Sequence, residues 1–460
     1  MNRNKSILVL GLLAFALLLL LSIIYYKERI IFLDPAFQLS YMIRDGGFAI
    51  QVNRFAAVIS KIFPYIAIKL AMPLRSIVLI YSMSFVIYNF ILFIIIIKWL
   101  KNSVWALFLL LYNILMISHS FYWPAIELNQ GIAIMILYFA LLDKRSSIGD
   151  TFSYILIALL VPSVVFSHPL VIIAFVFVTG YLFLFKRDIL QMPRFYAGTI
   201  LAFISYVINK IFFRNWYDDM NMERLDNFGK LFPDYINLKS NSDFVEYLFS
   251  DYYLSFILLV LIIGTFLISK RYKRIVYILS FIFIYIVVVN VSFPEGVPHF
   301  FAESKYQLLG IFIITALAMD IIDMINSKVM FFSLLFIIAI RIIHINNSHS
   351  LYSARLDLLR DIMHETGDEK LILSESELPK DTIIMSWASA YEFWLLSALE
   401  NQHQRSIIID ENPSRFDSLL DKKDIFIEEW RIYPYSVLPE RYFKLDSTTV
   451  YKKGSIKKYK

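Results

Sequence analysis

The sequence predicts an all-α polytopic membrane domain of about 11 transmembrane helices with a small C-terminal α/β domain. Its 460 residues are 58% hydrophobic and only 18% charged, whereas soluble domains are roughly 45–50% apolar and about 25% charged. The charges are also uneven, because residues 351–460 hold 16 of the 44 Lys and Arg and 19 of the 38 Asp and Glu. This composition excludes an ordinary soluble enzyme and a disordered chain, and the absence of cysteine excludes thiolate chemistry.

Eleven apolar runs indicate the membrane crossings, since a spanning helix needs about 20 mostly apolar residues. The stretch 151–185 is interpreted as two helices, because one helix of that length would reach about 52 Å, well beyond a hydrocarbon core of about 30 Å. Pro162 and the Ser-His-Pro sequence at 167–169 supply the break. The predicted membrane domain covers 1–346 and the soluble domain 350–460. The runs are 6–26, 76–99, 103–121, 126–142, 151–166, 169–185, 195–213, 252–269, 274–293, 306–325 and 328–346.

Clusters of Lys and Arg between the runs predict the orientation, because basic residues are retained on the cytoplasmic side. With eleven crossings, all these clusters fall on one face. The N-terminus is therefore predicted to be cytoplasmic, and segments 27–75 and 214–251 and the C-terminal domain to be extracytoplasmic. We expect a multi-pass protein of the cell inner (plasma) membrane, surrounded by membrane lipid and with no nucleic-acid partner. The clusters are Arg3/Lys5, Lys98/Lys101, Lys144/Arg145, Lys186/Arg187/Arg194, Lys270/Arg271/Lys273/Arg274 and Lys328.

The first outer segment, 27–75, is patterned as two juxtamembrane helices. Asp34, which is followed by a proline, is typical of a helix N-cap, and Gly46 is predicted to end that helix. A second helix is predicted over 54–70, where apolar side chains recur at helical spacing and basic residues, Lys61 among them, occupy the other side. This pattern is typical of a helix that lies flat in the membrane interface.

The C-terminal domain alternates β-branched runs with amphipathic ones, which favours a small α/β fold. A hairpin is predicted through Asp446-Ser447. No residue is predicted to bind a metal, and dependence on a divalent metal is left open. Strands are predicted at 371–373, 382–385, 406–410 and 424–427, and helices at 355–365 and 390–399.

Ionisable residues at the outer ends of the crossings are the candidate functional residues, because charges near a bilayer are costly. Asp34 is the leading candidate, with a role as helix cap only as its alternative. Arg44 and Arg54 suit a phosphate through their planar guanidinium groups, and interfacial anchoring is the alternative. Lys305 could pair with a lipid phosphate or extend to the membrane surface. The secondary candidates, for which capping or turn roles are the alternatives, are His119, Glu127, His168, His299 and Glu303.

One arrangement of residues carries a resemblance to a known family. The first outer loop begins with Ile30–Pro35 (Ile-Ile-Phe-Leu-Asp-Pro), continues through a helix to Tyr41 and then reaches the helix predicted over 54–70. This layout resembles the GT-C superfamily of polytopic membrane glycosyltransferases, in which a catalytic Asp or Glu lies early in such a loop. A weaker likeness to bacterial polysaccharide polymerases is carried by Glu127–Ala140 and Phe166–Pro169.

The resemblance implies a sugar donor linked to polyprenyl phosphate and a glycan, lipid or protein acceptor of the cell envelope. It implies that Asp34 is a general base on an acceptor hydroxyl, and that Arg44, Arg54 or Lys305 holds the departing phosphate. It implies no cofactor other than the donor. Aromatic residues of the second outer segment would stack on sugars or form an interface belt, and they are Trp216, Tyr217 and Phe228.

Two other functional classes remain open. The first is a polysaccharide polymerase or ligase, and the second is a transporter or flippase of lipid-linked glycans without catalysis. Transporters are typically built with ionisable residues and broken helices at mid-membrane. In this sequence, charges within the crossings are scarce and the candidates cluster at the outer ends. The sequence therefore favours a glycosyltransferase.

Overall fold

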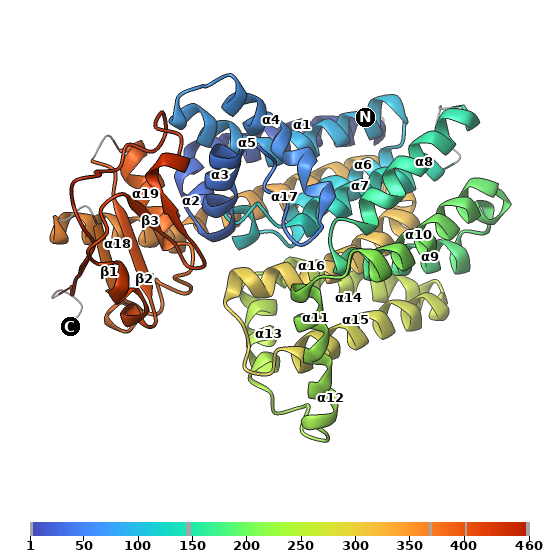
Figure 1. The fold of residues 1–460 in the computed structure, drawn as a ribbon. Helices are drawn as coiled ribbons and strands as arrows, with labels where there is room; N and C mark the ends of the chain where they lie inside the picture. Colours follow the sequence, from blue (N-terminus) through green and yellow to red (C-terminus); the bar gives the residue numbers. More distant parts are fainter. Residues whose placement is uncertain (1–2, 144–148, 368–369, 401–402, 457–460) are drawn as a thin grey trace.

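A computed structural model describes residues 3–143, 149–367, 370–400 and 403–456 (Figure 1). Most of these residues are helical, and the helices form a body that carries the C-terminal α/β domain at one end. The prediction of a mostly helical chain with apolar helices suited to a membrane and a small sheet region is confirmed. Lys144/Arg145, one of the basic clusters that predict the orientation in the membrane, lies outside the described residues.

Each of the eleven predicted runs contains a helix. Among the described residues, six helices are long and apolar enough to cross a membrane, and a seventh span results if α13 (Lys239–Ser250) and α14 (Tyr253–Ile268), which meet at 86°, count as one. The count of about eleven crossings stays a prediction. The six long helices are α1 (Arg3–Ile24), α5 (Leu74–Ile94), α10 (Pro193–Phe212), α15 (Tyr272–Ser292), α16 (His299–Ala316) and α17 (Ser327–Asn347). The shorter apolar helices are α6 (Ser103–Leu115), α7 (Glu127–Leu142), α8 (Asp150–Val165) and α9 (Pro169–Phe185).

The centre of the helical body consists of helices that are apolar on every side. α6, α7 and α16 bury nearly all of their side chains, as expected for core helices. Peripheral helices instead direct apolar side chains outward, for example Phe203 and Ile211 on α10 and Phe283 on α15. Exposed apolar surface of this extent is typical of helices that face lipid.

The first outer segment forms α2 (Tyr26–Ile30), α3 (Leu33–Asp45) and α4 (Val58–Lys69). The predicted helix end is confirmed, because Gly46 terminates α3 in the left-handed conformation with φ of 61°. The predicted N-cap is wrong. Phe32 occupies the cap position, and Asp34 lies inside the first turn with its side chain turned to the indole of Trp123.

The amphipathic helix α4 faces outward with its apolar side chains. Ile62, Ile66 and Leu70 are exposed, whereas its opposite face packs on the protein. This arrangement agrees with a helix whose apolar face contacts lipid. Lys61 lies on the side of the helix opposite these exposed apolar residues, as predicted. Its side chain is buried and its Nζ donates to the carbonyl of Ala49 at 3.0 Å.

The C-terminal domain contains two helices and five short strands in its described part. The first sheet is parallel with strand order β2-β1-β5, and β3 and β4 form an antiparallel pair. The predicted strands at 371–373, 406–410 and 424–427 are confirmed within a residue of their bounds. The elements are α18 (His349–Thr366), α19 (Ser389–Leu399), β1 (Lys370–Ser374), β2 (Ser406–Asp410), β3 (Ile425–Ile427), β4 (Ile432–Pro434) and β5 (Lys452–Lys453).

Two predicted elements of this domain do not form. Residues 382–385 are irregular. The carbonyls of Thr382 and Met385 accept hydrogen bonds from the buried side chain of Arg355 and not from a neighbouring strand. The predicted hairpin is also wrong. Asp446 accepts the backbone N–H of Thr448 in a local turn, and β5 then runs parallel to β1.

A buried ion pair joins the C-terminal domain to the first outer segment. Arg355 on α18 binds Glu392 on α19 with an Nη2–Oε2 distance of 2.8 Å, and neither side chain is more than 2% exposed. The other oxygen of Glu392 accepts the backbone N–H of Leu33 at 2.8 Å. The same junction buries a shared apolar core that includes Ile30 and Trp394. The start of α3 is therefore held by the C-terminal domain.

We expect Glu392→Ala to destabilise the protein strongly. Removal of one partner from a buried ion pair typically costs about 3–5 kcal/mol, because the other charge is left uncompensated. Thermal unfolding of the full chain in detergent, followed by tryptophan fluorescence, measures the loss. Asp357→Ala is the matched control on α18, because Asp357 is 70% exposed and pairs with Arg360 on the surface, where such pairs contribute about 0–1 kcal/mol. Equal unfolding temperatures for the two variants would contradict this account.

The predicted orientation can be tested on the full chain. Alkaline phosphatase fused to the C-terminus should be active, because that enzyme requires an extracytoplasmic location, whereas a fluorescent green protein fused there should stay dark. The expectation follows from the positive-inside rule applied to the Lys/Arg clusters of the described residues. An inactive phosphatase combined with a fluorescent fusion would place the C-terminus in the cytoplasm and contradict the predicted combination of a cytoplasmic N-terminus and eleven crossings.

Candidate functional site

A cavity of about 570 Å³ lies where the helical body meets the C-terminal domain, and this volume is within the range of about 300–1,000 Å³ that is typical of ligand sites. Its wall is built by the start of α3, the loop before α4, the turn before α7, α11 (Trp216–Glu223), α16 and the C-terminal domain. The cavity therefore combines segments from almost the whole length of the chain. The sequence-predicted candidates that line it are Asp34, Arg54, Glu127, His168 and Lys305.

Asp34 supplies a carboxyl group whose proton affinity is unusually high. Its Oδ2 accepts a hydrogen bond of 2.9 Å from the indole N–H of Trp123. Burial, with a contribution from the nearby Glu127 carboxylate, raises the pKa of Asp34 to about 6, and the Trp123 hydrogen bond and the charge of Arg54 limit that rise. A carboxyl with this pKa is ionised at neutral pH and can still accept a proton, as a general base requires.

Arg54 is a buried cation of the cavity wall. Its Nη1 lies 3.0 Å from Glu127 Oε2, and its Nη2 lies 3.5 Å from Asp218 Oδ1 on α11. Burial opposes the charge, but the Glu127 and Asp218 carboxylates outweigh burial and raise the pKa of Arg54. Its Nε is buried and has no hydrogen-bond partner in the described part of the chain. One donor of the guanidinium group is therefore unsatisfied.

Lys305 on α16 provides a second cation. Its Nζ lies 4.4 Å from the centre of the Phe301 ring, and no carboxylate among the described residues forms an ion pair with it. A lysine near an aromatic face and without a carboxylate partner is well suited to bind an anionic ligand.

His168 contributes a neutral donor and also caps a helix. Its Nδ1 accepts the backbone N–H of Leu170 at 3.2 Å at the start of α9. Burial and the charges of Arg54 and Lys305 lower the pKa of His168 well below its usual range. The ring is therefore uncharged, and since Nδ1 is an acceptor, the proton resides on Nε2.

Aromatic side chains form much of the remaining wall. Trp216 and Tyr217, two of the predicted sugar-stacking candidates, line the cavity. Phe228 does not, and packs against Tyr235 with 5.8 Å between ring centres. Three tryptophans of the wall were not predicted, because they reach the cavity only through tertiary packing and no pattern in the sequence marks them. They are Trp123, Trp387 and Trp430.

Arg44 lies outside the cavity. Its guanidinium binds the Asp45 carboxylate at 2.6 Å and stacks on Tyr41 and Tyr433, at 3.9 and 4.2 Å from the ring centres. Asp45, Tyr41 and Tyr433 therefore hold the Arg44 guanidinium where α3 contacts β4. The structure therefore does not bring Arg44 together with Asp34, and Arg44 is not part of the candidate site.

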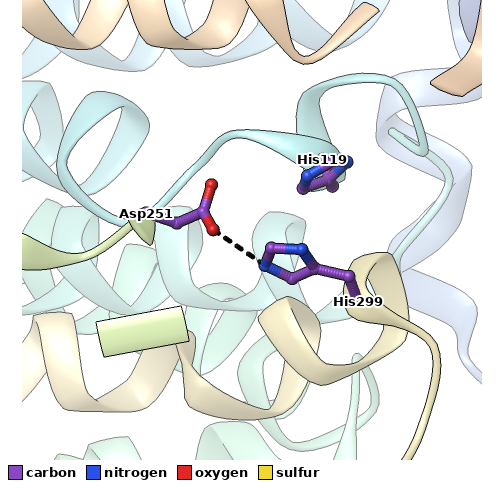
Figure 2. Close-up of side chains that lie close together, drawn as sticks. All are labelled: His119, Asp251 and His299. Carbon is purple, nitrogen blue, oxygen red and sulfur yellow. Dashed lines mark ion pairs between the residues drawn. The ribbon is translucent and has the colours of Figure 1, made fainter. Parts of the chain in front are cut away.

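The other three candidates, His119, His299 and Glu303, gather on the opposite face of α16 from the cavity. Glu303 is fully buried and accepts the backbone N–H groups of residues 118–120 at 2.8–3.0 Å. It therefore organises the turn before α7 and does not face the cavity. His119 and His299 lie beside Asp251 (Figure 2), with 4.4 Å between the two ring centres. Asp251 was not predicted, because a single acidic residue between two helices carries no distinctive signal.

Comparison with known proteins adds no relative. No family model, no curated protein and no solved structure matches the chain. The cavity contains a proton acceptor with a pKa near neutrality, two cations, a neutral imidazole donor and several aromatic faces. Together these groups can deprotonate a hydroxyl, bind a phosphate and stack on a sugar ring.

We expect Asp34→Asn to raise thermal stability at pH 7.5. The folded pKa of about 6 lies above the ordinary value of 3.8, so the stability contributed by this carboxyl is fully present below about pH 4 and is lost as the pH rises through 6. A neutral amide avoids that loss, which amounts to about 3 kcal/mol at most. The unfolding temperature of Asp34→Asn should exceed that of the wild type at pH 7.5, and the difference should shrink as the pH falls toward 4.

Asp45→Asn is the matched control for this substitution. Asp45 lies at the other end of α3 and is paired with Arg44 at the surface, so its replacement should change stability by less than about 0.5 kcal/mol. A lower unfolding temperature for Asp34→Asn at pH 7.5 would show that the Asp34 carboxylate stabilises the fold and would contradict the raised pKa.

Proposed function

We propose that the chain is an integral membrane glycosyltransferase. It moves a sugar from a polyprenyl-phosphate donor to an envelope glycan, lipid or protein acceptor on the outer face of the membrane. The observation that carries the proposal is that Asp34 and Arg54 of the first outer segment and Lys305 of α16 line one cavity. A base and cations suit this transfer, because the acceptor must lose a proton and the leaving phosphate must be stabilised.

The surroundings of the cavity favour a lipid-linked donor. A smaller hollow shares Val52, Arg54 and His168 with the cavity and extends to α9 and α10. The outward side chains of α10 are apolar, including Phe203 and Ile211, which are 69% and 65% exposed. A polyprenyl chain could therefore lie against α10 in the bilayer while its phosphate reaches Arg54.

The chemistry can be assigned to individual atoms. An acceptor hydroxyl gives its proton to the Asp34 carboxylate as its oxygen attacks the anomeric carbon of the donor. The bond between that carbon and the phosphate oxygen breaks, and polyprenyl phosphate leaves with the bonding electrons. Arg54 and Lys305 stabilise the negative charge on the leaving phosphate, and the proton passes from Asp34 to solvent or to the released phosphate. In the buried cavity these charge interactions are stronger than in water.

We expect Asp34→Asn to reduce sugar transfer by roughly 10²–10⁴-fold, the usual contribution of a general base, without reducing the amount of protein in the membrane. The wild-type kcat/KM should rise with pH through about 6, where Asp34 ionises, and the residual activity of the variant should lack this rise. Transfer from polyprenyl-linked sugars in membranes, measured between pH 5 and pH 8, tests both expectations.

Asp45→Asn serves as the control for activity also, because it makes the same chemical change on the same helix outside the cavity. It should retain the activity and the pH profile of the wild type. Full activity of Asp34→Asn at normal abundance would contradict the assignment of Asp34 as the base.

A further inference from the structure

Three side chains from separate parts of the chain converge behind the cavity (Figure 2). His119 comes from the turn before α7, Asp251 from the bend between α13 and α14, and His299 from the first residue of α16. One potential ligand atom of each lies within 4.8 Å of those of the other two.

The cluster contains two buried ring nitrogens that form no hydrogen bond with the described residues. These atoms are His119 Nδ1 and His299 Nε2. His299 Nε2 lies 3.2 Å from Asp251 Oδ2, but that contact lacks hydrogen-bond geometry. Buried polar atoms without partners are costly, so these nitrogens indicate that another group belongs between them and the carboxylate.

Neighbouring side chains fix the orientation of Asp251 and His299, as residues around the ligands of a metal site do. His344 Nε2 donates to Asp251 Oδ1 at 2.7 Å, and Oδ2, which accepts the Ser250 hydroxyl, faces the His299 ring. Tyr247 stacks on the His299 ring with 3.9 Å between centres. Supporting hydrogen bonds of this kind orient the ligands of metal sites and set their affinity.

A buried arginine holds two of the ligand-bearing segments together. Arg341 on α17 donates to the carbonyl of Asp251 at 2.6 Å and to the carbonyl of Ile117 and the hydroxyl of Ser118, at 2.9 and 2.7 Å. Glu303 binds the N–H of His119 from the other side at 3.0 Å. The backbones that carry His119 and Asp251 are therefore fixed before any ligand binds.

We propose that His119, Asp251 and His299 bind a divalent transition-metal ion, with Zn²⁺ as the best fit. Zn²⁺ is bound by imidazole nitrogen and carboxylate oxygen at about 2.0–2.2 Å in tetrahedral sites, which places ligand atoms about 3.4 Å apart. The observed 3.2 Å and the 4.8 Å limit require only small side-chain movements to reach that spacing. Two imidazoles favour Zn²⁺ over Mg²⁺ and Ca²⁺, which prefer oxygen ligands.

The metal would cross-link three segments, namely the turn before α7, the bend between α13 and α14, and the start of α16. His119 precedes by four residues Trp123, the partner of Asp34, and His299 begins the helix that carries Lys305. The metal site lies on the other face of α16 from these cavity residues, so the metal would not contact a ligand in the cavity. This inference does not rest on the proposed glycosyl transfer, and either can fail without the other.

The test uses the full chain, purified in detergent through an affinity tag that contains no histidine. Elemental analysis should find about one equivalent of Zn²⁺ per chain, and chelation should lower the unfolding temperature. Co²⁺ added to the chelated protein should give the visible absorption of a tetrahedral site. Absence of bound Zn²⁺ in the wild type, with no Co²⁺ absorption on titration, would overturn the proposal without recourse to any variant.

Variants locate the metal. The double variant His119→Ala/His299→Ala should bind Zn²⁺ at least about 100-fold more weakly than the wild type, because it lacks two ligands. The control removes two exposed histidines of the C-terminal domain, as His364→Ala/His403→Ala, and should bind as the wild type does. Asp251→Asn provides a second variant that preserves side-chain shape and should also weaken binding. Zn²⁺ binding of wild-type strength in both cluster variants would overturn the assignment.

Discussion

The buried ion pair between Arg355 and Glu392 is the contact on which the geometry of the cavity depends. One oxygen of Glu392 binds Arg355, and the other accepts the first backbone N–H of α3, at Leu33. Asp34 follows directly, so the orientation of the first turn of α3 is set by the C-terminal domain and not by the bilayer. Such a pair is tolerated in the interior because Arg355 also donates to the carbonyls of Thr382 and Met385, so that its donors are satisfied. The C-terminal domain is thus part of the scaffold of the site.

Helix α16 connects the cavity to the cluster of His119, Asp251 and His299, because its opposite faces contact the two. One face directs Lys305 and two phenylalanines into the cavity, and the other directs His299 and Glu303 toward the turn before α7. The same turn carries Trp123, which lines the cavity and donates a hydrogen bond to Asp34. α16 is buried nearly along its whole length, so both of its faces are packed against other parts of the protein.

The protonation states within the cavity depend on one another. Glu127 raises the proton affinity of Asp34, and Arg54 lowers it while it neutralises Glu127. Lys61, buried nearby, has its pKa lowered to about 8 by burial, although Glu127 and Asp34 favour its charge. Positive and negative groups are therefore close to balance before a ligand enters. An anionic phosphate would be attracted by Arg54 and Lys305 in a region where water screens charge poorly.

The sequence by itself determined the apolar runs, the two juxtamembrane helices, the glycine that ends α3 and most strands of the C-terminal domain, because hydrophobic periodicity and turn chemistry are properties of adjacent residues. It also supplied Asp34, Arg54, Glu127, His168 and Lys305 as candidates. Only the tertiary structure decided that these five line one cavity, that Arg44 does not, and that Asp34 binds Trp123 instead of capping its helix. Trp123 lies 89 positions from Asp34, and Glu392 lies 359 positions from Leu33. Contacts over such separations leave no periodic signal, because they arise from the packing of whole helices against one another.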